Sequence, residues 1–182
     1  MHLEYRFAGV GGQGAILAGV IFANAMIKYE GKHAVQSPSY TAAVRGGPTK
    51  VDVIVDDEPI IFPRATNINV MLSFHEKSFH AFAVNLADDV IIVADTDLNP
   101  GLKPDERTYL IPFYRIAKEV MGKVQVANVI ALGAIYAVTG IPKEESLRQA
   151  IKDRVPPAFV DLNMKAFDEG VKRIEELLKK GG

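Results

Sequence analysis

The pattern of apolar and polar residues changes twice within the first thirty positions and predicts the first elements of the fold. Residues 3–10 alternate and then become continuously apolar, which indicates a strand that is buried at its end. Residues 13–29 are apolar on almost every side, so the helix predicted there lies deep in a domain or against a partner. Glycines at positions 9, 11, 12 and 14 predict a tight turn between the two.

The rest of the chain continues as alternating strands and helices. Over 49–56, valines occupy every second position and share one face, with Lys50, Asp52, Ile54 and Asp56 on the other, which is typical of a half-exposed antiparallel or edge strand. The other predicted strands are 33–37, a short return strand at 60–62, 68–74, 90–94 and 108–111. The other predicted helices are 76–87, 114–121, 124–138, 142–154 and 159–180. On the last of these helices, the residues expected to face inward are Leu162, Phe167, Val171, Ile174 and Leu178. We expect a single α/β domain over 1–182, a three-layer α/β/α sandwich whose sheet is mostly parallel or mixed.

The glycine turn carries candidate chemistry. Gly9, Gly11 and Gly14 form a G-x-G-x-x-G pattern, with Gly12 and Gln13 inside it. A turn that opens a helix leaves backbone amides free at the positive end of the helix dipole, which suits a phosphate or carboxylate. A tight connection that binds nothing fits the pattern equally well when it stands alone.

A dinucleotide site is a further interpretation of this turn. It requires an acidic residue about 20 positions further on, at the end of the second strand. Glu30 has nearly that spacing, but it precedes the next predicted strand. NAD is therefore not the favoured ligand.

Two further features are candidate binding elements. A long loop at 38–48 ends in Arg45, Gly46 and Gly47, where an arginine can hold a phosphate or carboxylate and glycines permit a close backbone approach; an ordinary solvated arginine is the alternative. Asn128 is a polar residue within the apolar helix at 124–138. A buried asparagine needs hydrogen-bond partners, and a local backbone group is favoured over a ligand or another chain.

Composition excludes several classes of function. The 182 residues carry a net charge of −1, which gives no basic surface for nucleic acid or a membrane. No cysteine is present, so the chain holds no disulfide, cysteine-ligated cluster or thiol nucleophile. His75 and His80, five positions apart, and the turn residues Asp56 and Asp57 do not have the spacing of a metal site. We therefore expect neither a metal site nor catalytic residues on this chain.

The first residues lack the basic and apolar regions of a signal peptide. The apolar run at 15–27 contains Asn24 and is shorter than the ~20 residues that cross a bilayer. These features predict a soluble, cytoplasmic protein.

Four motifs occur together in a fixed order along the chain. They are Gly9-Val10-Gly11-Gly12-Gln13-Gly14, then Ser39-Tyr40 with Arg45-Gly46-Gly47, then Asn128 with Leu132-Gly133-Ala134, and finally the stretch from Leu162 to Gly170. Because it carries these four motifs in this order, the chain resembles the gamma subunit of 2-oxoacid:ferredoxin oxidoreductases over nearly its whole length. The segment before Tyr40 looks closer to the 2-oxoglutarate and branched-chain (ketoisovalerate) types than to the indolepyruvate type.

The resemblance implies an enzyme that converts a 2-oxoacid and coenzyme A to acyl-CoA, carbon dioxide and reduced ferredoxin. It places thiamine diphosphate and [4Fe–4S] clusters on alpha, beta and delta subunits or domains, with the gamma part a domain III-like α/β unit at the coenzyme A end of the site. This chain would bind no cofactor tightly and would reach ferredoxin through the complex; a homodimer is an alternative state of the isolated chain. The family often has a glycine and a glutamate where this sequence has Thr41 and Ala43.

We hypothesise that the glycine turn and the arginine loop lie close together and face an anion or a partner. A free-standing nucleotide-binding protein and a purely structural assembly subunit are the alternatives. The candidate binding residues are Gly11, Gly12, Gln13, Gly14, Ser39, Tyr40, Arg45, Gly46, Gly47 and Asn128.

Overall fold

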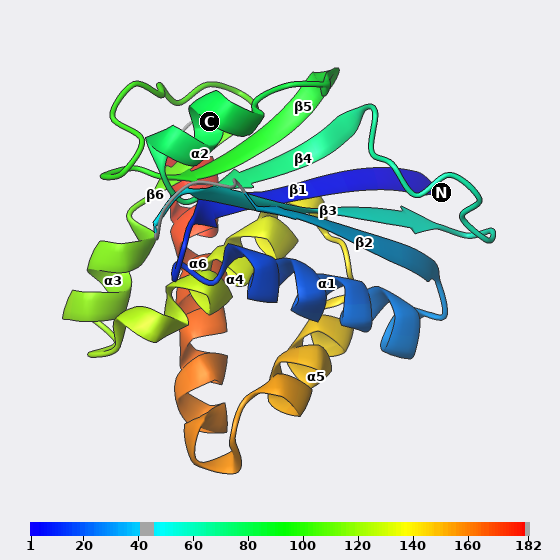
Figure 1. Ribbon diagram of the computed structural model, residues 1–182. Helices are drawn as coiled ribbons and strands as arrows, with labels where there is room; N and C mark the ends of the chain where they lie inside the picture. The colour runs from blue at the N-terminus through cyan, green and yellow to red at the C-terminus, as the bar shows by residue number, and fades with distance from the viewer. Residues whose placement is uncertain (41–45, 181–182) are drawn as a thin grey trace.

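A six-stranded mixed sheet forms the centre of the computed structural model, which describes residues 1–40 and 46–180 (Figure 1). The strand order is β2-β3-β1-β4-β5-β6, in which β1, β4, β5 and β6 are parallel and β3 runs antiparallel to both of its neighbours. The strands are β1 (His2–Val10), β2 (His33–Tyr40), β3 (Pro48–Asp56), β4 (Ile68–Ser73), β5 (Leu86–Asp95) and β6 (Thr108–Ile111). The predicted α/β class and the antiparallel excursion at β3 are confirmed.

Most of the helices pack on one face of the sheet, below it in Figure 1. The helices are α1 (Ala15–Glu30), α2 (Glu76–Phe82), α3 (Phe113–Glu119), α4 (Ala127–Thr139), α5 (Glu144–Arg154) and α6 (Val160–Lys180), with short 3₁₀ turns η1 (Val124–Val126) and η2 (Pro157–Phe159). Helices α1 and α4 are apolar all round because each is packed between the sheet and other helices. The predicted deep position of the first helix is confirmed.

Helices α4 and α6 approach each other unusually closely through two glycines. A Cβ atom built on Gly133 would lie 2.2 Å from the carbonyl oxygen of Phe167, and one built on Gly170 would lie 2.0 Å from the carbonyl oxygen of Ile130. Ordinary van der Waals contacts begin near 3.4 Å. Both glycines are therefore required by the close packing of the two helices.

The opposite face of the sheet is covered by α2 and the segment that joins β3 to β4. Two charged side chains of β1 hold this cover. Glu4 accepts hydrogen bonds from the amides of Thr66 and Asn67 at 2.7 and 2.6 Å. Arg6 donates to the carbonyl oxygens of Phe82 and Val84 at 2.8 and 2.7 Å. The second helical layer of the predicted sandwich is thus reduced to a single short helix.

The prediction of a half-exposed strand at 49–56 is wrong. Strand β3 lies between β1 and β2. Asp52, on the polar face of β3, is buried and forms a two-pronged ion pair with Arg6, with N–O distances of 2.7 and 2.9 Å. The return strand predicted at 60–62 is not formed either. Both edges of β3 are already paired by β1 and β2, so this segment cannot fold back onto the strand that it follows, and Ile61 is almost fully exposed.

Several element boundaries also differ from the prediction. Helix α2 ends at Phe82 and does not continue to residue 87, because Asn85 adopts a left-handed conformation with φ 55°. The carbonyl oxygen of Asn85 accepts from the amide of Ile68, and β5 begins at the next residue. Strand β2 continues through Pro38 to Tyr40, since a proline is tolerated in an edge strand. On α6, Leu178 is exposed instead of facing inward, because it lies beyond the part of the helix that packs on the core.

Candidate functional site

The glycine turn lies where the direction of chain winding reverses. From β1 the chain leads through α1 on one face of the sheet toward β2, whereas from the adjacent parallel strand β4 it leads through α2 on the other face toward β5 (Figure 1). Open α/β sheets bind ligands in the crevice outside the carboxyl ends of the strands at such a switch point. The fold therefore gives the turn a context that its glycine pattern alone did not supply.

Internal hydrogen bonds fix the shape of the turn. Gly12 and Gly14 adopt φ values of 84° and 77°, which favour glycine. The amide of Gln13 donates to the carbonyl oxygen of Val10 at 3.2 Å, and Oε1 of Gln13 accepts from the amide of Val10 at 2.8 Å. The side chain of Gln13 is therefore engaged with the turn itself, so its contribution to a ligand site is to hold the backbone in place.

Other amides of the turn have no acceptor within the described part of the chain. They belong to Gly12, Gly14 and Ala15, the last of which begins α1. No acidic residue lies in the first turn of α1, so its positive end is not neutralised from within the helix. These donors fit a phosphate or carboxylate oxygen.

The end of the arginine loop lies against this turn. The amide of Gly11 donates to the carbonyl oxygen of Gly47 at 3.2 Å, and a Cβ atom on Gly11 would lie 3.4 Å from the amide nitrogen of Gly46. The predicted proximity of the two motifs is confirmed for Gly46 and Gly47. Arg45, together with Thr41 and Ala43, lies outside the described residues.

Asn128 at the start of α4 supports the turn from below. It is buried, and its Nδ2 lies 3.5 Å from the carbonyl oxygen of Gly14. A Cβ atom on Gly14 would be 2.9 Å from the same nitrogen, so this position requires glycine for space as well as for φ. The expected local cap is wrong, because the partner of Asn128 is a backbone group 114 positions away.

Tyr114 and Asp95 also stabilise this region, and the sequence patterns did not indicate either. The hydroxyl of Tyr114 donates to the carbonyl oxygen of Gln13 at 3.0 Å, and burial raises the pKa of this phenol. The carboxylate of Asp95 accepts from the amide of Tyr114 at 3.1 Å; burial raises the pKa of Asp95, opposed by three backbone donors. Both side chains contact backbone groups, which leave no signature in the sequence. Both also lie far from the turn along the chain, so no local motif indicated them.

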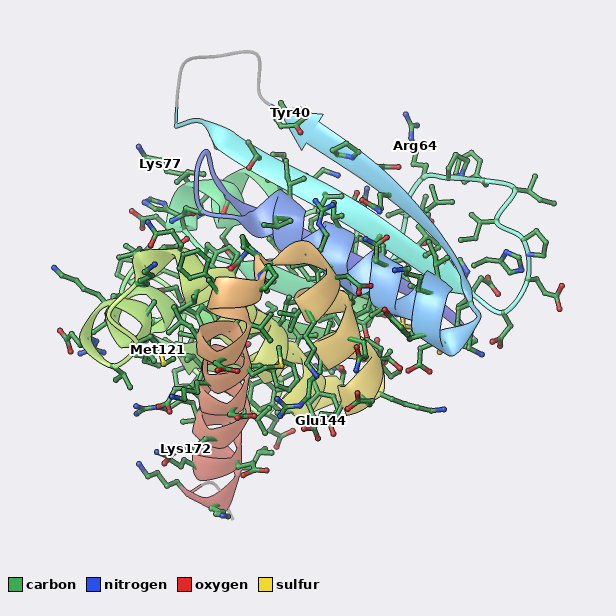
Figure 2. The ribbon with its side chains drawn as sticks, turned by 90° about the horizontal axis from the view of Figure 1, so that it is seen from below. Tyr40, Arg64, Lys77, Met121, Glu144 and Lys172 are labelled. Carbon is green, nitrogen blue, oxygen red and sulfur yellow. The ribbon has the colours of Figure 1, made fainter. Side chains whose placement is uncertain are left out.

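Ser39 and Tyr40 lie at the carboxyl end of β2, at the same edge of the sheet as the turn. Tyr40 pairs with Thr49 of β3, which in turn pairs with Gly9 of β1. This register places Tyr40 two strands, or roughly 10 Å, from the turn. Tyr40 is exposed, and Figure 2 shows it and Lys77 at this end of the molecule. Lys77, at the start of α2, is an exposed cation that no motif in the sequence indicated.

The remaining candidate chemistry is structural. Glu30 lies at the far end of α1, about 24 Å along the helix from the turn, and accepts from the amide of Lys143 at 2.9 Å. It is not placed to hold the ribose of a dinucleotide. His75 caps α2 by accepting from the amide of Lys77 at 3.1 Å.

Residues 1–40 and 46–180 contain no cluster of three or more histidine, aspartate or glutamate side chains that could hold a metal ion. None of the described helices combines the length and the apolar character of a membrane-spanning segment.

Known proteins match this chain both in sequence and in fold. The profile of the pyruvate ferredoxin/flavodoxin oxidoreductase family matches residues 4–173. The 2-oxoglutarate synthase subunit KorC of Methanocaldococcus jannaschii is 37% identical over 180 residues, covering 97% of this chain and 96% of the relative. The gamma subunit of a keto/oxoacid ferredoxin oxidoreductase from Geobacter sulfurreducens superposes with a TM-score of 0.85 at 38% identity, covering 97% and 98% of the two chains.

A longer chain contains the same fold. The 2-oxoglutarate:ferredoxin oxidoreductase of Magnetococcus marinus, solved with 2-oxoglutarate, coenzyme A and succinyl-CoA bound, superposes with a TM-score of 0.81 at 25% identity. The match covers 96% of this chain but 31% of that one. The present chain belongs to the pyruvate ferredoxin/flavodoxin oxidoreductase family, and the relatives that it matches over nearly the whole of both chains include gamma and KorC subunits of 2-oxoacid:ferredoxin oxidoreductases.

Proposed function

We propose that this chain is the gamma subunit of a cytoplasmic 2-oxoacid:ferredoxin oxidoreductase and is inactive alone. Alpha, beta and, as a further candidate, delta subunits would carry thiamine diphosphate and [4Fe–4S] clusters, and ferredoxin would accept the electrons. The observation that carries this proposal is the match to KorC and gamma subunits over 97% of the chain. The lack of cysteine supports the same division of labour, because the chain cannot ligate a cluster through thiolates.

Within the assembled enzyme, we assign this chain to the coenzyme A side of the active site. Coenzyme A carries phosphates, and the amides of Gly12, Gly14 and Ala15 are donors without an acceptor among the described residues. The residues present therefore fit the group. Gly46 and Gly47 bring the arginine loop against the same turn, so the guanidinium of Arg45 would supply a second, charged donor.

The test is a titration of the assembled enzyme with coenzyme A after Arg45→Ala. A hydrogen bond from a charged group contributes about 1.5–3 kcal/mol, so the KM for coenzyme A should rise by roughly ten- to a hundredfold. The KM for the 2-oxoacid should stay the same. Arg64→Ala, which removes an exposed arginine from the segment between β3 and β4, is the matched control and should change neither value.

The alternatives give different results in the same assay. An unchanged KM for coenzyme A in Arg45→Ala would rule out the anion-binding role and favour a purely structural assembly subunit. Binding of NAD by the isolated chain would favour a free-standing dinucleotide-binding protein, although the position of Glu30 argues against it.

A further inference from the structure

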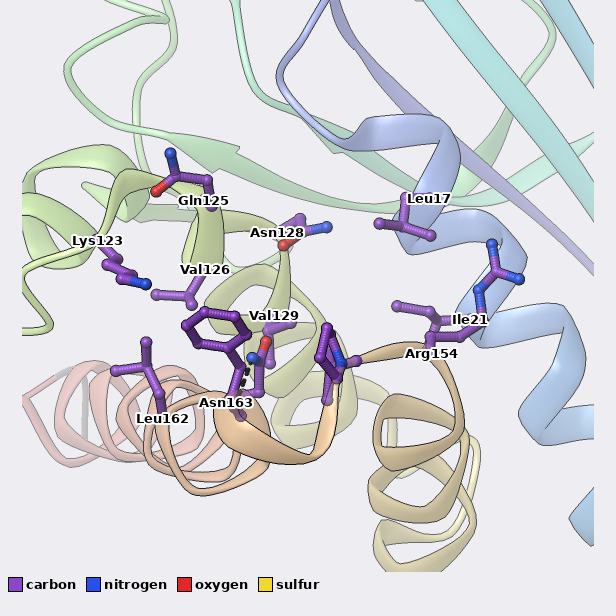
Figure 3. A pocket seen from close by; sticks show the side chains of 13 residues that line it. Leu17, Ile21, Lys123, Gln125, Val126, Asn128, Val129, Arg154, Leu162 and Asn163 are labelled. Atoms are coloured by element: carbon purple, nitrogen blue, oxygen red, sulfur yellow. Dashed lines mark hydrogen bonds between the residues drawn. The ribbon is translucent and has the colours of Figure 1, made fainter.

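A second recess lies on the helical side of the molecule, beside the glycine turn. It is a pocket of about 370 Å³ between the start of α1, the start of α4 and the η2 turn that leads into α6. Its walls are mainly apolar and include Leu17, Ile21, Val126, Val129, Phe159 and Leu162 (Figure 3). The proposed anion site does not use these side chains.

Two cations flank this pocket. Figure 3 shows Lys123 and Arg154 on opposite sides of it. The ammonium of Lys123 lies 4.0 Å from the centre of the Phe159 ring, and neither cation has a carboxylate partner within the described residues. The described residues that line the pocket include no acidic side chain. The mouth therefore favours a negatively charged occupant.

The interior offers few free polar groups to orient a small polar ligand. The Nδ2 of Asn163 donates to the carbonyl oxygen of Phe159 at 2.8 Å, and the Nδ2 of Asn128 points to Gly14. Small-molecule sites usually combine apolar walls with several convergent polar groups. Here the two asparagine amides are engaged in holding the pocket together, and the remaining uncharged polar side chain, Gln125, is exposed.

Apolar side chains continue from the pocket onto the surface around it. Leu17 and Phe159 line the pocket and are also exposed, and Val124 next to Lys123 is exposed as well. A deep apolar centre surrounded by exposed apolar side chains and charges at the edge is the usual composition of a protein–protein interface.

We propose that this pocket is a docking site for another subunit of the same enzyme, which inserts an apolar side chain flanked by a carboxylate. Charge complementarity with Lys123 and Arg154 selects the acidic flank, and the apolar walls select the inserted side chain. In the Magnetococcus marinus enzyme the same fold is part of a chain about three times as long, so additional polypeptide accompanies the fold there. This inference rests on the proposed function as a subunit.

The experiment is a competition during assembly. Wild-type and variant forms of the full chain, distinguished by tags of different size, are expressed together with the partner subunits, and the complex is purified through a tag on a partner. The double variant Lys123→Glu/Arg154→Glu should be incorporated at least tenfold less than the wild type. Leu17→Trp, which fills the pocket from an exposed position, should also be incorporated less.

Lys172→Glu is the control, because it reverses an exposed charge on α6 away from the pocket and should be incorporated equally (Figure 2). Thermal unfolding of each isolated variant checks that it is folded. Equal incorporation of both pocket variants in an intact complex would overturn this inference alone. Equal incorporation with weaker coenzyme A binding would overturn it in favour of a small-molecule site. A wild-type chain that joins no thiamine- or cluster-bearing subunit would overturn the proposed function itself.

Discussion

The close contact between α4 and α6 makes Gly170→Ala a severe test of the packing. A Cβ atom at this position would lie 2.0 Å from the carbonyl oxygen of Ile130, 2.9 Å from its carbonyl carbon and 3.0 Å from the amide nitrogen of Ala134. All three are backbone atoms of α4, so no side chain can rotate away to make room. The two helices must move apart to accommodate the methyl group.

Two effects of opposite sign decide the result. Alanine favours a helix over glycine by about 1 kcal/mol, whereas overpacking a well-filled core costs about 1–3 kcal/mol or more. Because the obstruction is backbone on every side, we expect the steric cost to exceed the gain and leave a net destabilisation of about 2 kcal/mol. For a domain of this size, this corresponds to a fall in Tm of roughly 4–8 °C.

The assay is thermal unfolding followed by circular dichroism. Gly101→Ala is the control, because no atom lies within 4 Å of its Cβ position and its φ is not in the left-handed region. Its Tm should stay close to that of the wild type. Gly133→Ala should also lower the Tm, and the double variant should lose less than the sum, since one separation of the helices relieves both contacts. A Tm for Gly170→Ala at or above the wild-type value would show that α4 and α6 accommodate the added methyl group without loss of stability.

Two further predictions concern charged groups. Asp52→Ala leaves the buried guanidinium of Arg6 without its carboxylate, so the free energy of unfolding in urea should fall by about 3–5 kcal/mol. The control Asp153→Ala removes an exposed partner of Lys28 and should leave the free energy of unfolding nearly unchanged. Equal losses in the two variants would contradict this account. The hydrogen bond from His2 to Asp56 raises the pKa of His2 above 6.5, so its stabilising contribution is present below pH 6.5 and is lost as the pH rises through the raised pKa. An NMR titration should show this pKa fall in Asp56→Asn, and a pKa of His2 that does not change would be the contrary result.

Local sequence patterns predicted the elements whose burial is decided by their own run of apolar residues and glycines. The glycine turn, the apolar helices α1 and α4 and the strand β5 follow from periodicity and glycine placement because each lies in the core or at its edge. The position of Asn128 in an apolar helix correctly indicated a buried polar group, although its partner could not be read from nearby residues.

The failures share a physical cause, which is pairing between distant parts of the chain. Asp52 reads as a solvent-facing residue until Arg6, 46 positions away, neutralises it inside the structure. Ile60, Ile61 and Phe62 have the composition of a strand, but the strand they follow has no open edge. The pocket beside α1 is assembled from four separate helical segments, and no pattern within any one of them indicates it.

The thin cover on the second face of the sheet has a consequence for how the molecule opens. Helix α2 and the β3–β4 connection are held by Glu4, Arg6 and a small apolar cluster around Ile54 and Met71, whereas the other face is buried under several interlocking helices. Cooperative opening units in proteins follow such differences in contact density. Amide protons in this cover should therefore exchange with solvent sooner than those of α1 and α4, and the cover should detach as one unit while the large core stays closed.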